Sequence, residues 1–560
     1  MPWSDWSDSK LLEELAKIDK DLYKDLKSII PTLKGDKWNE IELSTKSNLV
    51  SLLMSFSSSD YFSKKQNMYD CLMHLKPQRF KKLISELTKN GFLVKSTDFE
   101  KSVKNIQKIK WNNKEFATLF LNFFNLPDHF MPPDREQAPS FVDIFPISDE
   151  NPLPLINKPY KMLIDYQNQV YSKANEELKI PRTRFIIQMP TGSGKTRTSM
   201  EVISNHIKNS SKDSIVLWLA HSSELCEQSF QCFIETWQYS SNKNLKAIRY
   251  WGNHPKPDDC DEPMFIVGGF QKLNNILSKD QYALNSISQR ISLIVIDEAH
   301  KAVAPTYKKV ISILKNNETK IIGLTATPGR AEVEETKEMS DFFFGEKINI
   351  NPVGYSSEIE MLKSKKVLAK INYKAIISPL NLQLSPYQKN KLQETFDFPP
   401  SFIKTAATSN IRNIEIMQRL LSSCKQNGKI LFFSCSVKHS KFIVSLLLYF
   451  GIKAAHVDGS TKRARREQVI EDFRNGDIQV LCNFGVLTTG FDAPNTNEVF
   501  ISRPTNSVVL YSQMIGRGLR GPAIGGTPEC IISDVRDNII GFSNQERVYH
   551  WFEDFWDTVE

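Results

Sequence analysis

The chain has 560 residues, of which 40% are hydrophobic and 24% are charged, a composition typical of a soluble globular protein. Its formal net charge of +8 suits a nucleic-acid partner without requiring one. No run of eighteen apolar residues is present, which excludes a membrane-spanning helix, and the polar N-terminus MPWSDWSDSK has no signal-peptide pattern. The eight cysteines include no C-x-x-C pair, so we expect reduced thiols in a cytoplasmic protein and no zinc site.

Residues 1–125 are predicted to form a helical N-terminal domain. In KLLEELAKIDKDLYKDLKSII, leucines and isoleucines recur three or four residues apart and give one apolar helix stripe. We expect Pro31 to end that helix, because proline cannot continue helical hydrogen bonding. A proline-rich segment follows at residues 126–159, with eight prolines from Pro127 to Pro159. Helices cannot continue through that density, so we predict a linker arm and a domain boundary.

From residue 160 onward, short apolar runs alternate with helical stretches. Strand candidates in residues 160–364 are RFIIQM, SIVLWLA, MFIVGG, SLIVIDE and KIIGLTA, and a second series in residues 365–545 is ILFFSC, KAAHVDG, IQVLCN, EVFISR and CIISDV. Apolar strands alternating with helices indicate parallel sheets covered on both faces. The predicted fold is therefore α/β, with two tandem doubly wound lobes after the helical domain. Aromatic residues at helical spacing predict a final amphipathic helix at residues 546–560.

The stretch FIIQMPTGSGKT at residues 185–196 predicts a phosphate-binding loop. A strand that breaks into small residues and restarts as a helix gathers backbone N–H donors at the positive end of the helix dipole. Gly192 and Gly194 let the backbone approach a phosphate, Lys195 reaches the β- and γ-phosphates, and the Thr196 hydroxyl can bind Mg²⁺. Met189 stands where the usual pattern has its first glycine, and the variant P-T-G-S-G-K-T is typical of helicases.

A phosphate loop needs an acidic strand end, and LIVIDEAH supplies one about a hundred residues later. Asp297 ends an apolar strand and is predicted to hold Mg²⁺. Glu298 is placed to polarise the attacking water. In QMIGRGLR, Arg517 and Arg520 are predicted to stabilise charge on the γ-phosphate, because a guanidinium fork matches its oxygens. If they come from the second lobe, the site is complete only when the lobes close.

These motifs, together with WLAHSSELCEQ, GGFQKL, LTATP and LTTGFDAP, resemble those of superfamily 2 helicases and translocases of the DEAH type, from residue 160 to about 540. The resemblance implies two RecA-like lobes that hydrolyse ATP with Mg²⁺. It implies nucleotide contacts by Gln167, Thr191, Gly192, Ser193, Gly194, Lys195, Thr196, Gly490 and Asp492. It implies catalytic roles for Glu298, Gln513, Arg517 and Arg520. It implies coupling or nucleic-acid contacts by His221, Gln271, His300, Thr325, Thr327 and Thr488.

The stretch VLTTGFDAPNTNEVFISRPTNSVVLYSQMIGRGLRGP resembles the branch with type III restriction helicase subunits and the repair helicase RadD. This implies an ATP- and Mg²⁺-dependent DNA helicase or double-stranded DNA translocase, in DNA repair, restriction or phage defence. Two alternatives stay open: an RNA-directed helicase or ATPase, and a nucleic-acid-sensing ATPase subunit of a multi-protein defence complex. The N-terminal helical domain, which has no counterpart in that branch, predicts a protein partner.

Overall fold

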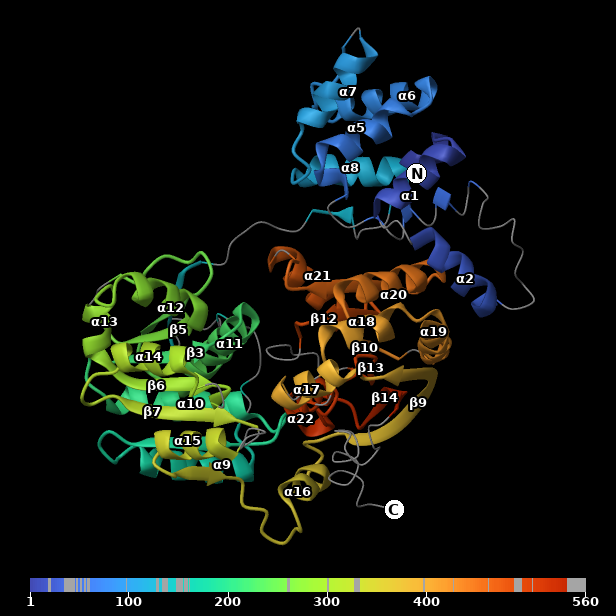
Figure 1. Ribbon diagram of the computed structural model, residues 1–560. Helices are drawn as coiled ribbons and strands as arrows, with labels where there is room; N and C mark the ends of the chain where they lie inside the picture. The colour runs from blue at the N-terminus through green and yellow to red at the C-terminus, as the bar shows by residue number, and fades with distance from the viewer. Residues whose placement is uncertain are drawn as a thin grey trace.

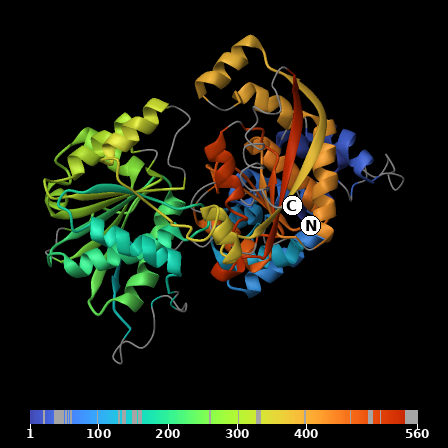
Figure 2. The ribbon, with the colours of Figure 1, turned by 90° about the horizontal axis from the view of Figure 1, so that it is seen from below.

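A computed structural model gives the fold of the chain. It describes residues 1–18, 22–34, 46, 49–50, 53–54, 57, 61–96, 98–126, 130–132, 139–147, 155, 160, 162–258, 262–299, 302–326, 333–395, 398–426, 428–461, 463–487, 496–505 and 507–540. The predicted C-terminal helix at residues 546–560 therefore lies outside the described residues. In Figure 1 two α/β lobes stand side by side, and the N-terminal helices lie over the second of them; Figure 2 gives the same arrangement from below.

The first lobe is built on an eight-stranded sheet in the order β1-β4-β5-β3-β6-β7-β2-β8. All neighbouring strands are parallel except β1 and β4, which pair antiparallel with Phe141 opposite Ile248. The strands are β1 (Phe141–Ile144), β2 (Arg184–Gln188), β3 (Ile215–Ala220), β4 (Leu245–Tyr250), β5 (Met264–Gly269), β6 (Ile291–Asp297), β7 (Lys320–Thr325) and β8 (Lys347–Asn349). Strand β1 lies inside the segment predicted as a linker, so that segment also contributes an edge strand.

Helices cover both faces of this sheet because its central strands are apolar on both sides. In β3, Val216 and Trp218 belong to one core, while Leu217 and Leu219 belong to the other. The helices of the lobe are α9 (Asp165–Glu177), α10 (Lys195–Asn209), α11 (Ser223–Ser240), α12 (Phe270–Lys279), α13 (Asn285–Arg290), α14 (Pro305–Leu314), α15 (Val333–Phe342) and α16 (Glu358–Ser364). This is the doubly wound arrangement that the alternating apolar runs predicted.

The second lobe repeats the plan with a six-stranded, all-parallel sheet in the order β11-β12-β10-β13-β14-β9. Its strands are β9 (Lys370–Gln383), β10 (Ile430–Phe433), β11 (Ala454–Asp458), β12 (Val480–Phe484), β13 (Glu498–Ile501) and β14 (Glu529–Ile540). Its helices are α17 (Pro386–Thr395), α18 (Pro400–Thr408), α19 (Asn410–Lys425), α20 (Val437–Tyr449), α21 (Arg463–Asn475) and α22 (Val508–Ile515). A fully buried ion pair joins α19 to β14, with Arg412 Nε 2.7 Å from Asp537 Oδ1.

The N-terminal region is helical, as predicted. Its α-helices are α1 (Asp8–Ile18), α2 (Leu22–Lys34), α5 (Lys65–Met73), α6 (Pro77–Lys89), α7 (Phe99–Lys108) and α8 (Lys114–Phe124). Aromatic rings fill its core: Phe62 packs against Trp3, Trp111 and Phe120. Helix α2 continues past Pro31, so the prediction that this proline ends the helix was wrong. A proline inside a helix removes one hydrogen bond, and apolar packing can offset that loss.

The N-terminal helices pack onto the second lobe. Helix α2 lies against α19, where Asn410 Nδ2 donates to Ser28 Oγ at 2.7 Å. Buried apolar residues run without interruption from the N-terminal helices into the second lobe. Among the described residues, no helix is both long and apolar enough to cross a membrane.

Candidate nucleotide-binding site

The site lies at the carboxyl edge of the first sheet. Because parallel strands end at the same edge, the residues that follow β2, β6 and β7 come together there. Gln188 pairs with Thr325, and Asp297 pairs with Leu324. The loop after β2 is tied to β7, since the Met189 N–H donates to the Thr325 carbonyl at 3.1 Å.

The predicted phosphate loop has a conformation that suits an anion. Gly192 and Gly194 both have left-handed backbones, with φ of 85° and 86°. Gly194 caps α10, whose first residue is Lys195 and which runs for fifteen residues. The unpaired N–H groups of the first helical turn and the helix dipole therefore point at the loop. Thr196 follows in the same turn, so a phosphate-binding lysine and a hydroxyl for Mg²⁺ stand together.

Two residues of α9 hold this loop in place. The Tyr166 hydroxyl donates to the Ser193 carbonyl at 2.6 Å, and Gln167 Nε2 donates to the same oxygen at 3.0 Å. Gln167 Oε1 accepts from the Ile164 N–H at 2.9 Å, which fixes the orientation of the amide. A Cβ on Gly194 would collide with Gln167 Nε2, so only glycine fits between the amide and the loop. Gln167, for which the family resemblance implies a nucleotide contact, is thus also a contact of the phosphate loop.

The acidic pair lies at the same edge of the sheet as the loop, with β7 between the two strands that lead to them. Asp297 ends β6 and is 6% exposed. Glu298 has a left-handed backbone with φ of 60°, and its N–H donates to Asp297 Oδ1 at 3.1 Å. A non-glycine residue in this region is uncommon, and sparsely populated backbone regions cost about 1–3 kcal/mol and cluster at functional sites. The strain turns the chain sharply after the strand and presents two successive carboxylates.

The second lobe covers the phosphate loop. A Cβ on Gly516, at the end of α22, would collide with Thr191 Cγ2. A Cβ on Gly192 would lie 3.3 Å from Leu368 Cδ2 and 3.8 Å from Leu519 Cβ. Two residues that lie more than 300 positions apart in the sequence, Thr191 and Gly516, are therefore in direct contact, and the two lobes form one site.

The two predicted arginines have different surroundings. Arg517 is half-buried, and its Nε donates to the Gln513 carbonyl at 3.2 Å. Burial lowers the pKa of Arg517 to about 10, against the opposing effect of Glu298 and Asp297. The charges of the acidic pair in the first lobe therefore act on Arg517 of the second. Burial also lowers the pKa of Arg520 to about 10, and nearby Arg474 lowers it further.

Helix α22, which precedes these arginines, is anchored to the second sheet. The Tyr511 hydroxyl donates to Asp534 Oδ2 at 3.2 Å, and both residues are buried. Burial raises the pKa of Asp534 to about 6, although Arg536 opposes the shift. The anchor fixes the end of α22 from which Arg517 projects toward the first lobe.

The residues present fit ATP and Mg²⁺. The loop has two glycines with left-handed backbones, which other residues rarely adopt, and Lys195 supplies a positive charge at the start of α10. Mg²⁺ is usually bound by one or two protein oxygens together with substrate phosphates and water. Thr196 and Asp297, the residues predicted to hold the metal, would provide those two oxygens. Within the described residues no group of three or more His, Cys, Asp or Glu side chains is placed to hold a metal.

Other predicted residues occupy the same edge or lie outside the described part of the chain. His221 directly follows β3, and Gln271 lies in the first turn of α12 directly after β5. Thr325 ends β7 and is buried. Outside the described residues lie His300, Thr327, Thr488, Gly490 and Asp492.

Sequence reasoning missed two contacts to the loop, Leu368 and Leu519. Leu519 lies within QMIGRGLR, but the chemistry of that motif points to its arginines and gives no reason to single out a leucine. Leu368 precedes β9 and belongs to no motif, so no sequence signal identifies it.

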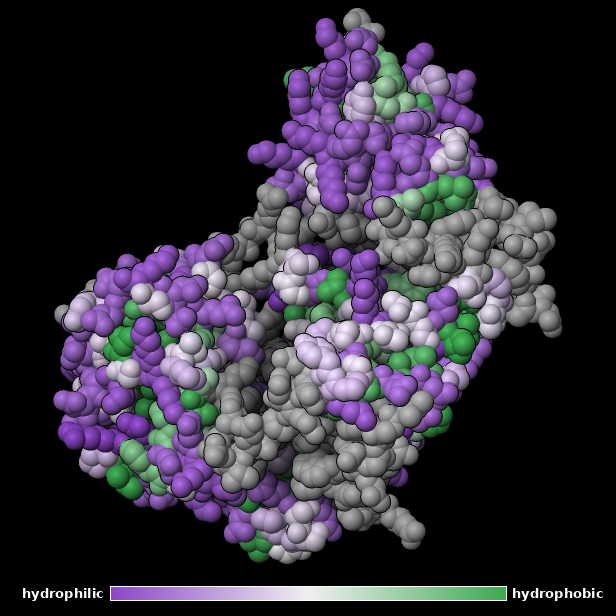
Figure 3. Space-filling view, viewed as in Figure 1, coloured by the Kyte–Doolittle hydropathy of each residue, from purple (hydrophilic) through white to green (hydrophobic). Residues whose placement is uncertain are grey.

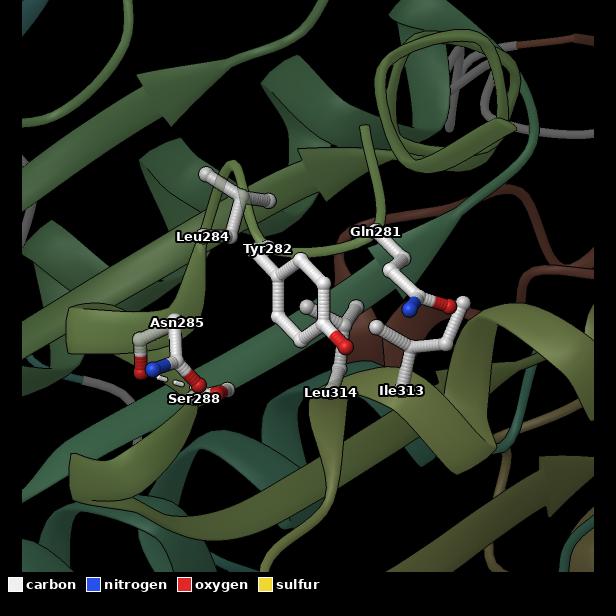
Figure 4. Close-up of a pocket in the computed structure, with 7 residues that line it drawn as sticks. All are labelled: Gln281, Tyr282, Leu284, Asn285, Ser288, Ile313 and Leu314. Atoms are coloured by element: carbon white, nitrogen blue, oxygen red, sulfur yellow. Dashed lines mark hydrogen bonds between the residues drawn. The ribbon is translucent and has the colours of Figure 1, made fainter. Parts of the chain in front are cut away.

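A cavity of about 230 Å³ elsewhere in the first lobe is a separate feature (Figure 4). It is lined by Gln281, Tyr282, Leu284, Asn285, Ser288, Ile313 and Leu314. Helix α13 leads into the amino end of β6, and α14 leads toward the amino end of β7. The cavity therefore lies at the edge of the sheet opposite the phosphate loop.

Comparison with known proteins identifies both lobes. The family model of the type III restriction enzyme res subunit matches residues 160–330, and that of the helicase conserved C-terminal domain matches residues 412–521. The chain is 28% identical over 373 residues to the putative ATP-dependent helicase IRC3 of Saccharomyces cerevisiae, which covers 64% of this chain and 49% of that protein. It is 21% identical over 361 residues to the ATP-dependent RNA helicase DBP3 of Kluyveromyces lactis, with 63% of each protein covered.

A solved structure also matches. The Pyrococcus furiosus Hef helicase domain aligns with 20% identity and a TM-score of 0.40, over 70% of this chain and 97% of that domain. The chain spans about half to three-fifths of the length of the curated relatives it matches. With both matched domains in order along the two lobes, the chain belongs to the superfamily 2 helicases, in their type III restriction subunit-like branch.

Proposed function

We propose that this chain is an ATP- and Mg²⁺-dependent motor that moves along DNA, as a helicase or a double-stranded DNA translocase. The observation that carries the proposal is the close approach of the lobes at the phosphate loop, where Gly516 lies against Thr191 and the charges of Asp297 and Glu298 act on the neighbouring Arg517. An arginine that reaches across the lobes makes hydrolysis depend on closure. Closure and reopening then change the spacing of two nucleic-acid contacts, which is how such a cleft moves along a strand.

The roles of the residues follow from their chemistry. The loop N–H groups and Lys195 bind the phosphates, and Thr196 and Asp297 hold Mg²⁺, which neutralises phosphate charge when bound. Glu298 orients the attacking water and accepts its proton. Arg517 offsets the charge that develops on the γ-phosphate oxygens. His221 and Gln271, at the same edge of the sheet, are proposed contacts of the nucleic-acid backbone.

The proposal is tested by ATPase activity with duplex, forked and single-stranded DNA and with RNA, at matched nucleotide concentrations. We expect duplex or forked DNA to stimulate hydrolysis most, and Lys195→Ala to abolish hydrolysis with every substrate. Stimulation by RNA alone would instead favour the RNA-directed enzyme, and hydrolysis unchanged in Lys195→Ala would refute the site.

A protein partner bound through the N-terminal helices remains a prediction of the sequence. It would make the chain the sensing ATPase of a larger assembly. Co-purification of the full chain with a second protein, retained in the Lys195→Ala variant, tests it.

A further inference from the structure

The charge of this chain is concentrated in one region, residues 61–124. That region holds 13 lysines and arginines against 5 aspartates and glutamates, a net charge of +8. This equals the net charge of the whole chain, so the remaining residues, including both helicase lobes, are neutral in sum. The basic character noted from composition therefore belongs to the N-terminal helices.

The lysines gather on the solvent faces of α6 and α7. In α7, Lys101, Lys104 and Lys108 are three and four residues apart and form one exposed stripe, opposite buried Val103 and Ile106. The stripe extends about 10 Å along the helix.

Helix α6 also carries lysines on its solvent side. Lys81, Lys82 and Lys89 are exposed, opposite buried Leu83 and Leu87. In Figure 1 both helices lie at the end of the N-terminal region farthest from the second lobe, and Figure 3 shows mostly hydrophilic residues over this region.

These six lysines, which we call the α6–α7 lysine face, lie on two helices that touch through Phe80 and Phe99, whose ring centroids are 4.5 Å apart. Within the described residues none of them forms an ion pair, and Lys108 only donates to Asn105 Oδ1 at 3.4 Å. By contrast, Arg79 of α6 is paired with Asp5 at 3.3 Å. Six like charges on neighbouring helices repel one another, so their surface is stabilised by an extended polyanion.

We propose that the α6–α7 lysine face binds the phosphate backbone of nucleic acid, as a second contact surface outside the helicase lobes. A B-form duplex carries about six phosphate charges over 10 Å of its axis, so the three lysines of the α7 stripe, which has the same length, would all find phosphate partners. Contacts of lysine to phosphate carry no sequence information and fix position instead. Since α2 packs on α19, nucleic acid held here moves with the second lobe. This inference rests on the proposed function in one respect, namely that the polyanion bound by the lysine face is nucleic acid.

The test measures binding by the full chain without nucleotide, using fluorescein-labelled duplex DNA, single-stranded DNA and RNA over a range of salt concentrations. The variant Lys101→Glu/Lys104→Glu/Lys108→Glu is compared with a control of equal charge, Lys173→Glu/Lys279→Glu/Lys315→Glu, at exposed positions of the first lobe. We expect the α7 variant to lose affinity at least about 10-fold and its log–log salt slope to fall by about 2–3, since each phosphate contact contributes about 0.9. The control should bind within about 2-fold of wild type.

Folding and hydrolysis are followed in the same samples. The replaced lysines are exposed, so the melting temperature and the ATPase rate without nucleic acid should match wild type. If the α7 variant melts early, the equivalent α6 variant at Lys81, Lys82 and Lys89 replaces it. The test measures nucleic-acid binding alone. Its result can therefore be interpreted even if the proposed ATPase activity is absent.

Three results would overturn the proposal. The first is equal affinity and equal salt slope in wild type and the α7 variant. The second is an equal loss in the control variant. The third is unchanged nucleic-acid binding together with loss of a co-purifying protein or of binding to phosphatidylserine vesicles, which would assign the face to a protein or to a membrane surface.

Discussion

The two lobes share one plan, yet the edges at which they meet, the carboxyl edge of the first sheet and the amino edge of the second, carry opposite chemistry. The first lobe presents a phosphate loop and the acidic pair Asp297 and Glu298. The second lobe presents Arg517, held on a helix that Tyr511 anchors to the sheet. Neither edge alone combines a phosphate cradle, a water-orienting carboxylate and an arginine. The difference indicates that the proposed catalytic site forms where the two lobes meet. Substitutions of site residues in either lobe should therefore lower the ATPase rate more than they lower the stability of the fold.

The largest expected effect is at the arginine that crosses between the lobes. Arg517→Ala should lower kcat by roughly 10³-fold or more with little change in ATP affinity, because the arginine acts on transition-state charge. Arg520→Ala should cost less, since the charges of Asp297 and Glu298 act on Arg517, whereas the charge of Arg474 acts on Arg520. Steady-state ATPase assays decide this, with exposed Arg182→Ala as the control. Equal losses at both arginines would contradict the distinction.

On the first lobe, Glu298→Gln should lower kcat by about 10²–10⁴-fold while ATP binding persists. The amide keeps the shape of the side chain and leaves Asp297 and Thr196 to hold Mg²⁺. Binding of a fluorescent ATP analogue and single-turnover hydrolysis measure the two effects separately. If ATP binding and hydrolysis were lost together, Glu298 would instead hold the conformation of the phosphate loop and would not act mainly on the attacking water.

The close approach of the lobes is tested at Gly516. Gly516→Ala should lower kcat by about 10–100-fold, because its Cβ meets Thr191 and displaces the neighbouring Arg517. A misplacement of about 1 Å can lower a rate by about 10²-fold. Thr191→Ser removes the methyl group that is struck first, so the double variant should recover part of the loss. Gly428→Ala, whose nearest contact is 3.4 Å away, is the control. An unaffected rate in Gly516→Ala would mean that this contact is absent during turnover.

The smallest effect concerns the anchor under α22. Since burial raises the pKa of Asp534 to about 6, its proton favours the folded state. Its contribution is therefore fully present below about pH 4 and is lost as the pH rises through 6. Asp534→Asn should remove that dependence and raise stability at pH 7 by about 2–3 kcal/mol. Urea unfolding at pH 4, 5, 6 and 7 measures it.

The matched control for this prediction is Asp537→Asn. It leaves buried Arg412 unpaired and should destabilise by about 3–5 kcal/mol. Stabilisation by both substitutions, or by neither, would show that the two carboxylates have the same environment.

The sequence by itself determined the local chemistry. The glycines before Lys195 dictate a loop at a helix start, and the apolar run before Asp297 dictates a buried strand ending in an acid. These features depend on residues within a few positions of one another, so spacing alone reveals them. The alternation of apolar runs likewise predicted two parallel sheets with helices on both faces.

Only the tertiary structure decided how distant segments meet. It placed Gly516 against Thr191 and Leu368 over Gly192, and it inserted Phe141–Ile144 of the predicted linker as an edge strand. It also joined α2 to α19. Such contacts depend on the shape of packed surfaces, and a leucine that covers a loop has the same sequence signature as any core leucine. Sequence spacing identifies which residues lie at the facing edge of each lobe. The contact between those edges forms only after both lobes have folded.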